Sequence, residues 1–203
     1  MNHANNPCMR MTLTALAISA HFVVSLALAA PLDAAATQPR QDAKAEAAVK
    51  DFNKAIADYM ALRRRLRSEV SGPVKNSTSS QVTNASDALA AAIERARPDA
   101  QVGSIFTPAI SAVIKKQITD AIRDDDLEDV LSDIDDEQVT ALKPSVHLRL
   151  PVSAQMATMP ASLLKVLPPL PKELEYRILG RYLVIRDVDA SLILDYIPAA
   201  VPR

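Results

Sequence analysis

The chain has 203 residues, a formal net charge of −1 and only 3% aromatic residues. A nearly neutral chain with few aromatic side chains lacks both the basic surface and the stacking platforms of nucleic-acid-binding proteins, so we expect no nucleic-acid partner. Three isolated glycines and a single cysteine exclude a P-loop, a dinucleotide-binding fingerprint, a G-x-S-x-G nucleophile elbow and a disulfide framework.

The N-terminal residues have the order of a secretory signal peptide. Arg10 is followed by a mostly apolar run, 13–28, and then by small residues that fit a signal-peptidase site ending at Ala29. We favour cleavage after Ala29; cleavage after Ala36 and retention of the run as a membrane anchor are the alternatives. Residues 1–29 are therefore predicted to be a signal peptide, and the protein is predicted to be exported. The mature protein is expected in the periplasm or secreted, with no membrane association after cleavage.

The mature chain is predicted to form one domain. Removing 29 of the 203 residues leaves 174, which is enough for a single hydrophobic core. Cys8 leaves with the signal peptide, so the mature chain has no thiol and no cysteine metal site. Residues 30–41 have no periodicity and are predicted to be a flexible tether. The domain is then 42–203, with a helical part, 42–142, and a β-rich part, 143–203.

An amphipathic helix is predicted over residues 42–68. Apolar residues recur there at steps of three and four, and Arg63 is the one charged break in that stripe. The cluster from Arg63 to Arg67 is interpreted as cations that favour the helix C-terminus and face solvent. A patch for an anionic envelope component is the alternative interpretation of the same cluster.

Two further helices are predicted in the helical part. After a polar loop at 71–84, an apolar stripe runs from Val82 until Pro98 ends it, and this helix is expected to pack antiparallel on the first. Thr107 followed by Pro108 is the pattern of an N-cap residue and a first helical residue, which begins the third helix.

A run of nine carboxylates between Asp124 and Glu137 is the one stretch with candidate metal ligands. No register in it has the glycine at the sixth position and the glutamate at the twelfth that an EF-hand loop needs. We therefore expect a short amphipathic helix with solvated acids and no bound cofactor. Binding of a divalent cation in the periplasm is the alternative, with candidate ligands Asp124, Asp125, Asp126, Glu128 and Asp129.

The hydrophobic period changes to alternation in the last part of the chain. Residues 146–150 are predicted to be a strand, with His147, the one histidine outside the signal region, as a solvated residue rather than a ligand or base. A short helix is predicted at 161–166, between prolines.

A three-stranded meander is predicted from Leu174 to Ile197. Asp187 and Asp189 are interpreted as turn residues that bind local amides. Asp195 lies within an apolar strand, and it is expected either to face solvent or to pair with an arginine of the sheet.

The C-terminal part of the chain resembles sequences of known proteins. The run MPASLLKVLPPLPKELEYRILGRYLVIRDVDASLILDYIPAAVP, together with ERARPDAQVGSIFTP upstream, resembles a group of small exported bacterial proteins of unknown function. The resemblance covers about two thirds of the mature chain and implies a bacterial envelope protein without assigned catalytic residues. The C-terminal part is also similar to the C-terminal hairpin of periplasmic nickel and cobalt homeostasis proteins. Because this chain has almost no histidine, we do not take this second similarity to imply a role in metal homeostasis.

The sequence thus predicts an α+β domain, with an N-terminal helical hairpin and further helices packed on a small antiparallel meander. No pairing of a nucleophile with a base is found, so we expect a protein that is not an enzyme. We expect an interaction or accessory module with an envelope protein as partner. The candidate partner surface is Arg177, Arg181, Arg186 and Asp195.

Overall fold

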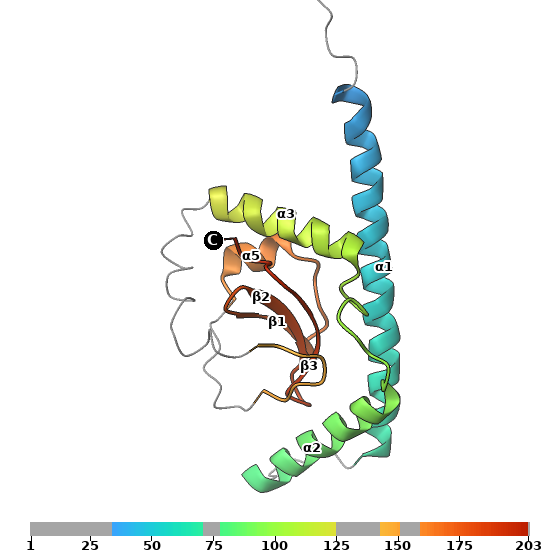
Figure 1. Ribbon diagram of the computed structural model, residues 1–203. Helices are drawn as coiled ribbons and strands as arrows, with labels where there is room; N and C mark the ends of the chain where they lie inside the picture. Colours follow the sequence, from blue (N-terminus) through green and yellow to red (C-terminus); the bar gives the residue numbers. More distant parts are fainter. Residues whose placement is uncertain (1–33, 71–77, 125–142, 151–158, 203) are drawn as a thin grey trace, which may run out of the picture.

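A computed structural model describes residues 34–70, 78–124, 143–150 and 159–202. Within these ranges the elements follow in the order α1 (Ala34–Glu69), α2 (Ser79–Ala96), α3 (Pro108–Asp124), α5 (Ala161–Val166), β1 (Leu174–Leu179), β2 (Tyr182–Asp187) and β3 (Leu192–Ile197). The chain is an α+β protein in which helices pack on a three-stranded antiparallel meander (Figure 1). None of the helices in the described ranges is long and apolar enough to cross a membrane.

Helix α1 begins earlier than the sequence predicts. It starts at Ala34, so residues 34–41 are helical and do not form the predicted tether. Alanine has the highest intrinsic helix propensity, and five of these eight residues are alanine or glutamine, which is also a good helix former. From Ala48 to Leu66 one side of α1 is buried, and the predicted stripe of apolar residues is confirmed.

Helix α2 also begins before its apolar stripe, within the predicted loop. Thr78 accepts a hydrogen bond from the backbone of Gln81, and the Gln81 side chain accepts one from the backbone of Thr78. This reciprocal capping box satisfies two amides that the first helical turn leaves without partners. Figure 1 shows that α2 meets the C-terminal part of α1 at a steep angle and then extends away from it. The two helices are therefore not an antiparallel pair along their lengths.

Helices α3 and α5 agree with the predicted boundaries. Helix α3 starts at Pro108, directly after Thr107, and buries Ile110, Ile114 and Ile118. Helix α5 covers Ala161–Val166, as predicted, and the prolines after it prevent its continuation. A turn closed by a hydrogen bond from the amide of Leu174 to the carbonyl of Pro171 then leads into β1.

The sheet is the predicted meander with strand order β1-β2-β3. Leu179 pairs with Tyr182 across a two-residue turn, in which Gly180 has a φ of 54°. A positive φ at the first central position is the conformation of a type II′ hairpin turn, which glycine adopts without strain. Between β2 and β3 the register shifts after Ile185, because Ile185 pairs with Asp195 while the next residue pairs with Ile193.

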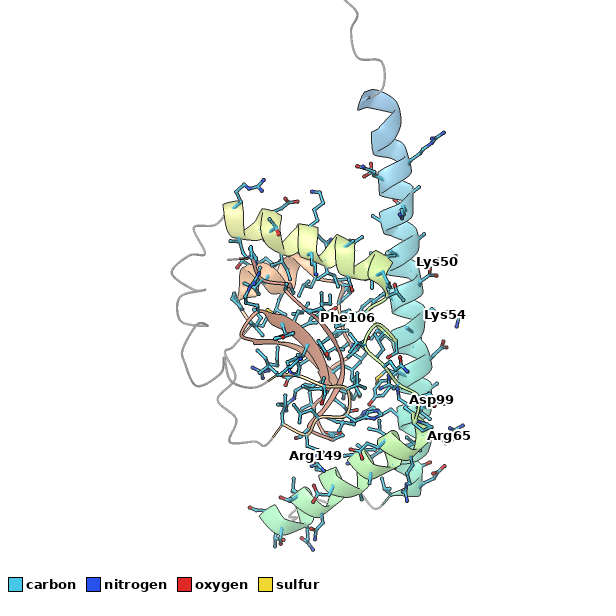
Figure 2. The ribbon with its side chains drawn as sticks, viewed as in Figure 1. Lys50, Lys54, Arg65, Asp99, Phe106 and Arg149 are labelled. Atoms are coloured by element: carbon cyan, nitrogen blue, oxygen red, sulfur yellow. The ribbon has the colours of Figure 1, made fainter. Side chains whose placement is uncertain are left out.

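One face of the sheet forms the main core with the helices. The aromatic rings of Phe52 on α1, Phe106 before α3 and Tyr176 on β1 stack in series, with centroid distances of 5.7 and 6.4 Å. Figure 2 shows Phe106 in the middle of the body, whereas Lys50 on α1 points outward. Aliphatic residues of α3, α5 and all three strands complete this cluster.

The opposite face of the sheet carries a smaller apolar cluster. Leu150, Leu179, Val184 and Ile193 form it. The predicted strand at 146–150 is present only as a short pairing with the edge of β3, where Arg149 forms an isolated bridge with Leu192.

Candidate functional site

Two buried carboxylates, Asp187 on β2 and Asp195 on β3, are the most unusual chemical groups of the described residues. Both are 0% exposed, and both face the helices from the same side of the sheet. An unpaired carboxylate at such a position would lose several kcal/mol of solvation, so each needs donors nearby. The donors at each carboxylate show whether it is free for chemistry.

Asp187 is bound by helix α1. Arg63 Nε donates to Asp187 Oδ2 at 2.6 Å, and the hydroxyl of Tyr59 donates to the same oxygen at 2.8 Å. The other oxygen accepts from the backbone of Ala190 at 3.0 Å. Asp189 accepts a second bond from Arg63, at 2.6 Å, but its side chain is 49% exposed. Three elements of the fold therefore meet at one carboxylate.

The protonation states in this cluster follow from the contacts. Burial and the neighbouring Asp187 raise the pKa of Tyr59 well above its usual value, so the phenol stays protonated and donates. Burial alone would lower the pKa of Arg63, but its bonds to Asp187 and Asp189 outweigh that effect and raise it. The guanidinium thus remains charged, and the cluster is a closed ion-pair network.

The interpretation of the two aspartates as turn residues is confirmed only in part. Asp187 does accept from the local amide of Ala190, as expected for a turn. Its main partners, however, are Tyr59 and Arg63, which are 128 and 124 residues away in the chain. Arg63, the one break in the apolar stripe, is on the buried face because Asp187 is there, so it does not belong to a solvated arginine cluster.

Asp195 is bound by the connection between α2 and α3. Its carboxylate accepts hydrogen bonds from the backbone amides of Gly103, Ile105 and Phe106 at 3.0, 2.7 and 2.8 Å. A further bond comes from the amide of Tyr196, at 2.8 Å. The expectation that Asp195 faces solvent or pairs with an arginine is therefore wrong.

Arg97, at the end of α2, contacts Tyr59, which binds Asp187, and Ser104, in the segment that binds Asp195. Its guanidinium carbon lies 5.5 Å from the ring centre of Tyr59, and Nη2 donates to the hydroxyl of Ser104 at 3.2 Å. Burial lowers the pKa of Arg97, while the charge of Asp195 opposes this effect. Within the described ranges, Nη1 is buried without a hydrogen-bond partner. A cleft of about 470 Å³ opens beside this side chain, between α1 and residues 96–105.

The predicted partner surface is not a single surface in the structure. Arg177 and Arg186 lie on the outer sheet face, where they pair with Glu175 at 2.8 and 2.7 Å. Arg181 is in the hairpin turn and donates to the backbone oxygen of Val201 at 3.1 Å. Asp195 is buried on the opposite face. The structure brings together two of the four residues, and they are arranged around a shared glutamate.

His147 is partly buried and has a strained backbone. Its φ is 66°, in the left-handed region that only a few per cent of non-glycine residues adopt. Burial and the nearby charge of Arg97 lower its pKa, and Glu94 opposes them, so the imidazole is neutral at pH 7. Its Nε2 is buried and finds no hydrogen-bond partner in the described part of the chain. The prediction of a solvated strand residue is therefore correct only in part, because the side chain is half-buried.

The acidic run lies almost entirely outside the described residues. Asp124 is the last residue of α3, and the other candidate ligands, Asp125, Asp126, Glu128 and Asp129, fall in 125–142. Among the residues that the structure does describe, no group of three or more His, Cys, Asp or Glu side chains could hold a metal ion. The chain matches no protein-family model, no curated protein and no solved structure.

Proposed function

We propose that this protein is an exported, non-catalytic interaction module of a bacterial envelope. One observation carries the proposal: the buried carboxylates Asp187 and Asp195 both serve the architecture. Together they accept bonds from α1, from the α2–α3 connection and from the turn before β3. A general base needs a free lone pair aimed at a substrate, and these oxygens are aimed at donors of the protein itself.

The proposed export rests on the sequence before α1. Arg10, the apolar run 13–28 and the small residues up to Ala29 have the order that a secretion signal needs. The absence of a cysteine after Cys8 fits an oxidising compartment, in which an unpaired thiol would be open to oxidation.

A rigid body with a charged outer helix suits an interaction role. Helix α1 is fixed to the sheet by its buried ion pair and presents Lys50, Lys54 and Arg65 on its outer side (Figure 2). The partner we propose is a protein of the envelope, recognised by the outer side of α1 together with the cleft beside Arg97. Interfaces of this kind combine an apolar centre with a polar rim.

Site-specific photo-crosslinking in cells tests the proposal. A photoreactive residue at Ala100, which lines the cleft, should form one discrete adduct with an envelope protein, and the same residue at exposed Ala109 on α3 is the matched control. The adduct partner, once purified, should bind the protein with a one-to-one ratio and a dissociation constant of micromolar or tighter. Equal labelling at both positions, or a purified partner that does not bind, would refute the interaction role at this cleft.

A further inference from the structure

Arg97 is a half-buried cation that forms no ion pair with any carboxylate of the described residues. Its guanidinium makes one hydrogen bond, from Nη2 to the hydroxyl of Ser104 at 3.2 Å, and lies over the ring of Tyr59. Asp195 is near enough for its charge to act on Arg97, but its two oxygens accept bonds from four backbone amides. The charge of Arg97 is therefore not neutralised by a direct contact within the described ranges.

The contrast with Arg63 shows how this fold treats a cation that it needs for stability. Arg63 is 6% exposed and has carboxylate oxygens of Asp187 and Asp189 at 2.6 Å. Burial acts to lower the pKa of both arginines, but only Arg63 has hydrogen bonds to carboxylates that reverse this effect. Buried charges in proteins are normally paired. Arg97 thus destabilises the free protein until an anion reaches it.

The cleft beside Arg97 has room for such an anion. Its volume is about 470 Å³, within the range of about 300–1,000 Å³ that is typical of binding pockets. Ala55 and Leu62 on α1 give it an apolar wall, and Ser104 lines it from the connection to α3. The hydroxyl of Ser104 accepts the bond from Arg97 and can still donate its own proton. A carboxylate in the cleft would therefore meet a cation and a second donor.

Two acids also line the cleft, but neither cancels the attraction of Arg97 for an anion. Asp58 is already paired with Lys54 at 2.7 Å, and its side chain is 65% exposed. Asp99 is exposed, so water and salt screen its repulsion. The half-buried guanidinium is screened less, and its interaction with a carboxylate at contact distance is the stronger one.

We propose that the cleft holds a side-chain carboxylate of the envelope partner, bound by the guanidinium of Arg97 and the hydroxyl of Ser104. This assignment rests on the proposed function, because it names the chemistry of the partner at the same cleft. A side chain that projects from a folded partner can enter the cleft while that partner also contacts the outer side of α1. Nη1 of Arg97 is enclosed in the free protein, so we expect the guanidinium to turn toward the cleft when the carboxylate binds.

The stability of the free protein separates a binding role of Arg97 from a structural one. Arg97→Met keeps an unbranched side chain beside Tyr59 and removes the unpaired charge, so the urea midpoint should stay unchanged or rise. Arg63→Met is the matched control, and its midpoint should fall because Asp187 is left buried without its cation. Comparable falls for both variants would show that Arg97 serves the fold, and would overturn the proposal.

Short peptides test the preference for a carboxylate. The probe is acetyl-Ala-Glu-Ala-amide, and acetyl-Ala-Gln-Ala-amide is a neutral peptide of the same shape. The backbone amide signals of Ala100 and Ser104, which line the cleft, report binding in an NMR titration of the protein. The glutamate peptide should bind about tenfold more tightly, because hydrogen bonds between charged groups are stronger than those with a neutral acceptor. Arg97→Met should abolish this preference, and Arg97→Lys should keep part of it.

Three results would contradict the carboxylate site. The two peptides could bind equally, or the preference for glutamate could persist in Arg97→Met. In the third, trialanine with a free C-terminal carboxylate binds more tightly than the glutamate peptide, which makes a chain terminus the ligand and overturns the assignment to a side chain.

Photo-crosslinking at Ala100 distinguishes this inference from the proposed function. Arg97→Met should lower the yield of the adduct several-fold, whereas Arg95→Met, at an exposed position of α2, should leave it unchanged. An adduct that forms equally well in Arg97→Met keeps the interaction role and refutes the carboxylate site. The lack of any discrete adduct in the natural chain refutes the interaction role at this cleft, whatever the peptides show.

Discussion

Replacing Asp187 by asparagine should be one of the most damaging conservative changes in this protein. The substitution keeps the shape of the side chain but removes the charge that faces Arg63, whose own side chain is only 6% exposed. Removing one partner of a buried ion pair costs about 3–5 kcal/mol, because the other charge stays buried without compensation. Here Asp189 still binds Arg63 at 2.6 Å, so we place the loss near the lower end, at about 3 kcal/mol.

Urea unfolding followed by circular dichroism measures this loss, since the chain has no tryptophan for a fluorescence assay. The midpoint should fall while the slope of the transition stays unchanged. Asp189→Asn is the matched control, with an expected loss of at most about 1 kcal/mol because that carboxylate is 49% exposed. The double replacement Arg63→Met with Asp187→Asn should be less destabilising than Asp187→Asn alone, because no buried charge is then left without a partner. Equal losses for the two asparagine variants would refute the assignment of Asp187 as the central partner of Arg63.

Three further predictions concern separate parts of the structure. Asp195→Asn should lower the free energy of unfolding by about 2–3 kcal/mol, because the backbone amides that bind Asp195 lose a charged acceptor. Hydrogen exchange at the amide of Phe106 should accelerate more than exchange in α3, and unchanged exchange at Phe106 would argue against its hydrogen bond to Asp195. Phe106→Ala should lower the free energy of unfolding by about 3–5 kcal/mol, measured by thermal or urea unfolding, because it leaves a cavity at the centre of the aromatic stack. A loss below about 1 kcal/mol would contradict the central position of this ring. The pKa of His147 is lowered by burial, so the unfolded chain binds its proton more readily than the folded one. Stability should therefore decline as the pH falls below about 6.5, and His147→Gln should remove that part of the decline; an NMR titration showing a raised pKa would reverse the sign.

The elements of this fold could be predicted from local patterns, and the contacts between them could not. Hydrophobic periodicity and turn residues within short stretches of sequence predict the apolar stripe on α1, the start of α3 at Thr107–Pro108 and the three-stranded meander. The early start of α2 was also readable, because Thr78 and Gln81 have the spacing of a capping box. Nothing local, however, pairs Arg63 with a residue 124 positions away.

The orientation of Asp195 shows why the candidate site was mispredicted. Simple alternation places Ile193, Asp195 and Ile197 on one face of a strand. The register shift in β3 breaks this rule, because Ile193 pairs with Arg186 on the outer face while Asp195 pairs with Ile185 on the core face. An extra residue of this kind redirects every side chain on one side of it. Arg63 in the apolar stripe of α1 and Asp195 in the apolar strand β3 nevertheless indicated buried polar contacts, because a buried charge requires a partner.

The separation between Arg63 and Asp187 also constrains when this protein can become folded. Synthesis proceeds from the N-terminus, so α1 is complete long before β2 exists. Until then Arg63 has no carboxylate to pair with, and burying it would be unfavourable. Contacts of such long sequence separation form slowly, because the intervening chain must be closed into a loop first. The core around Arg63 can therefore be completed only after the last strands have been synthesised.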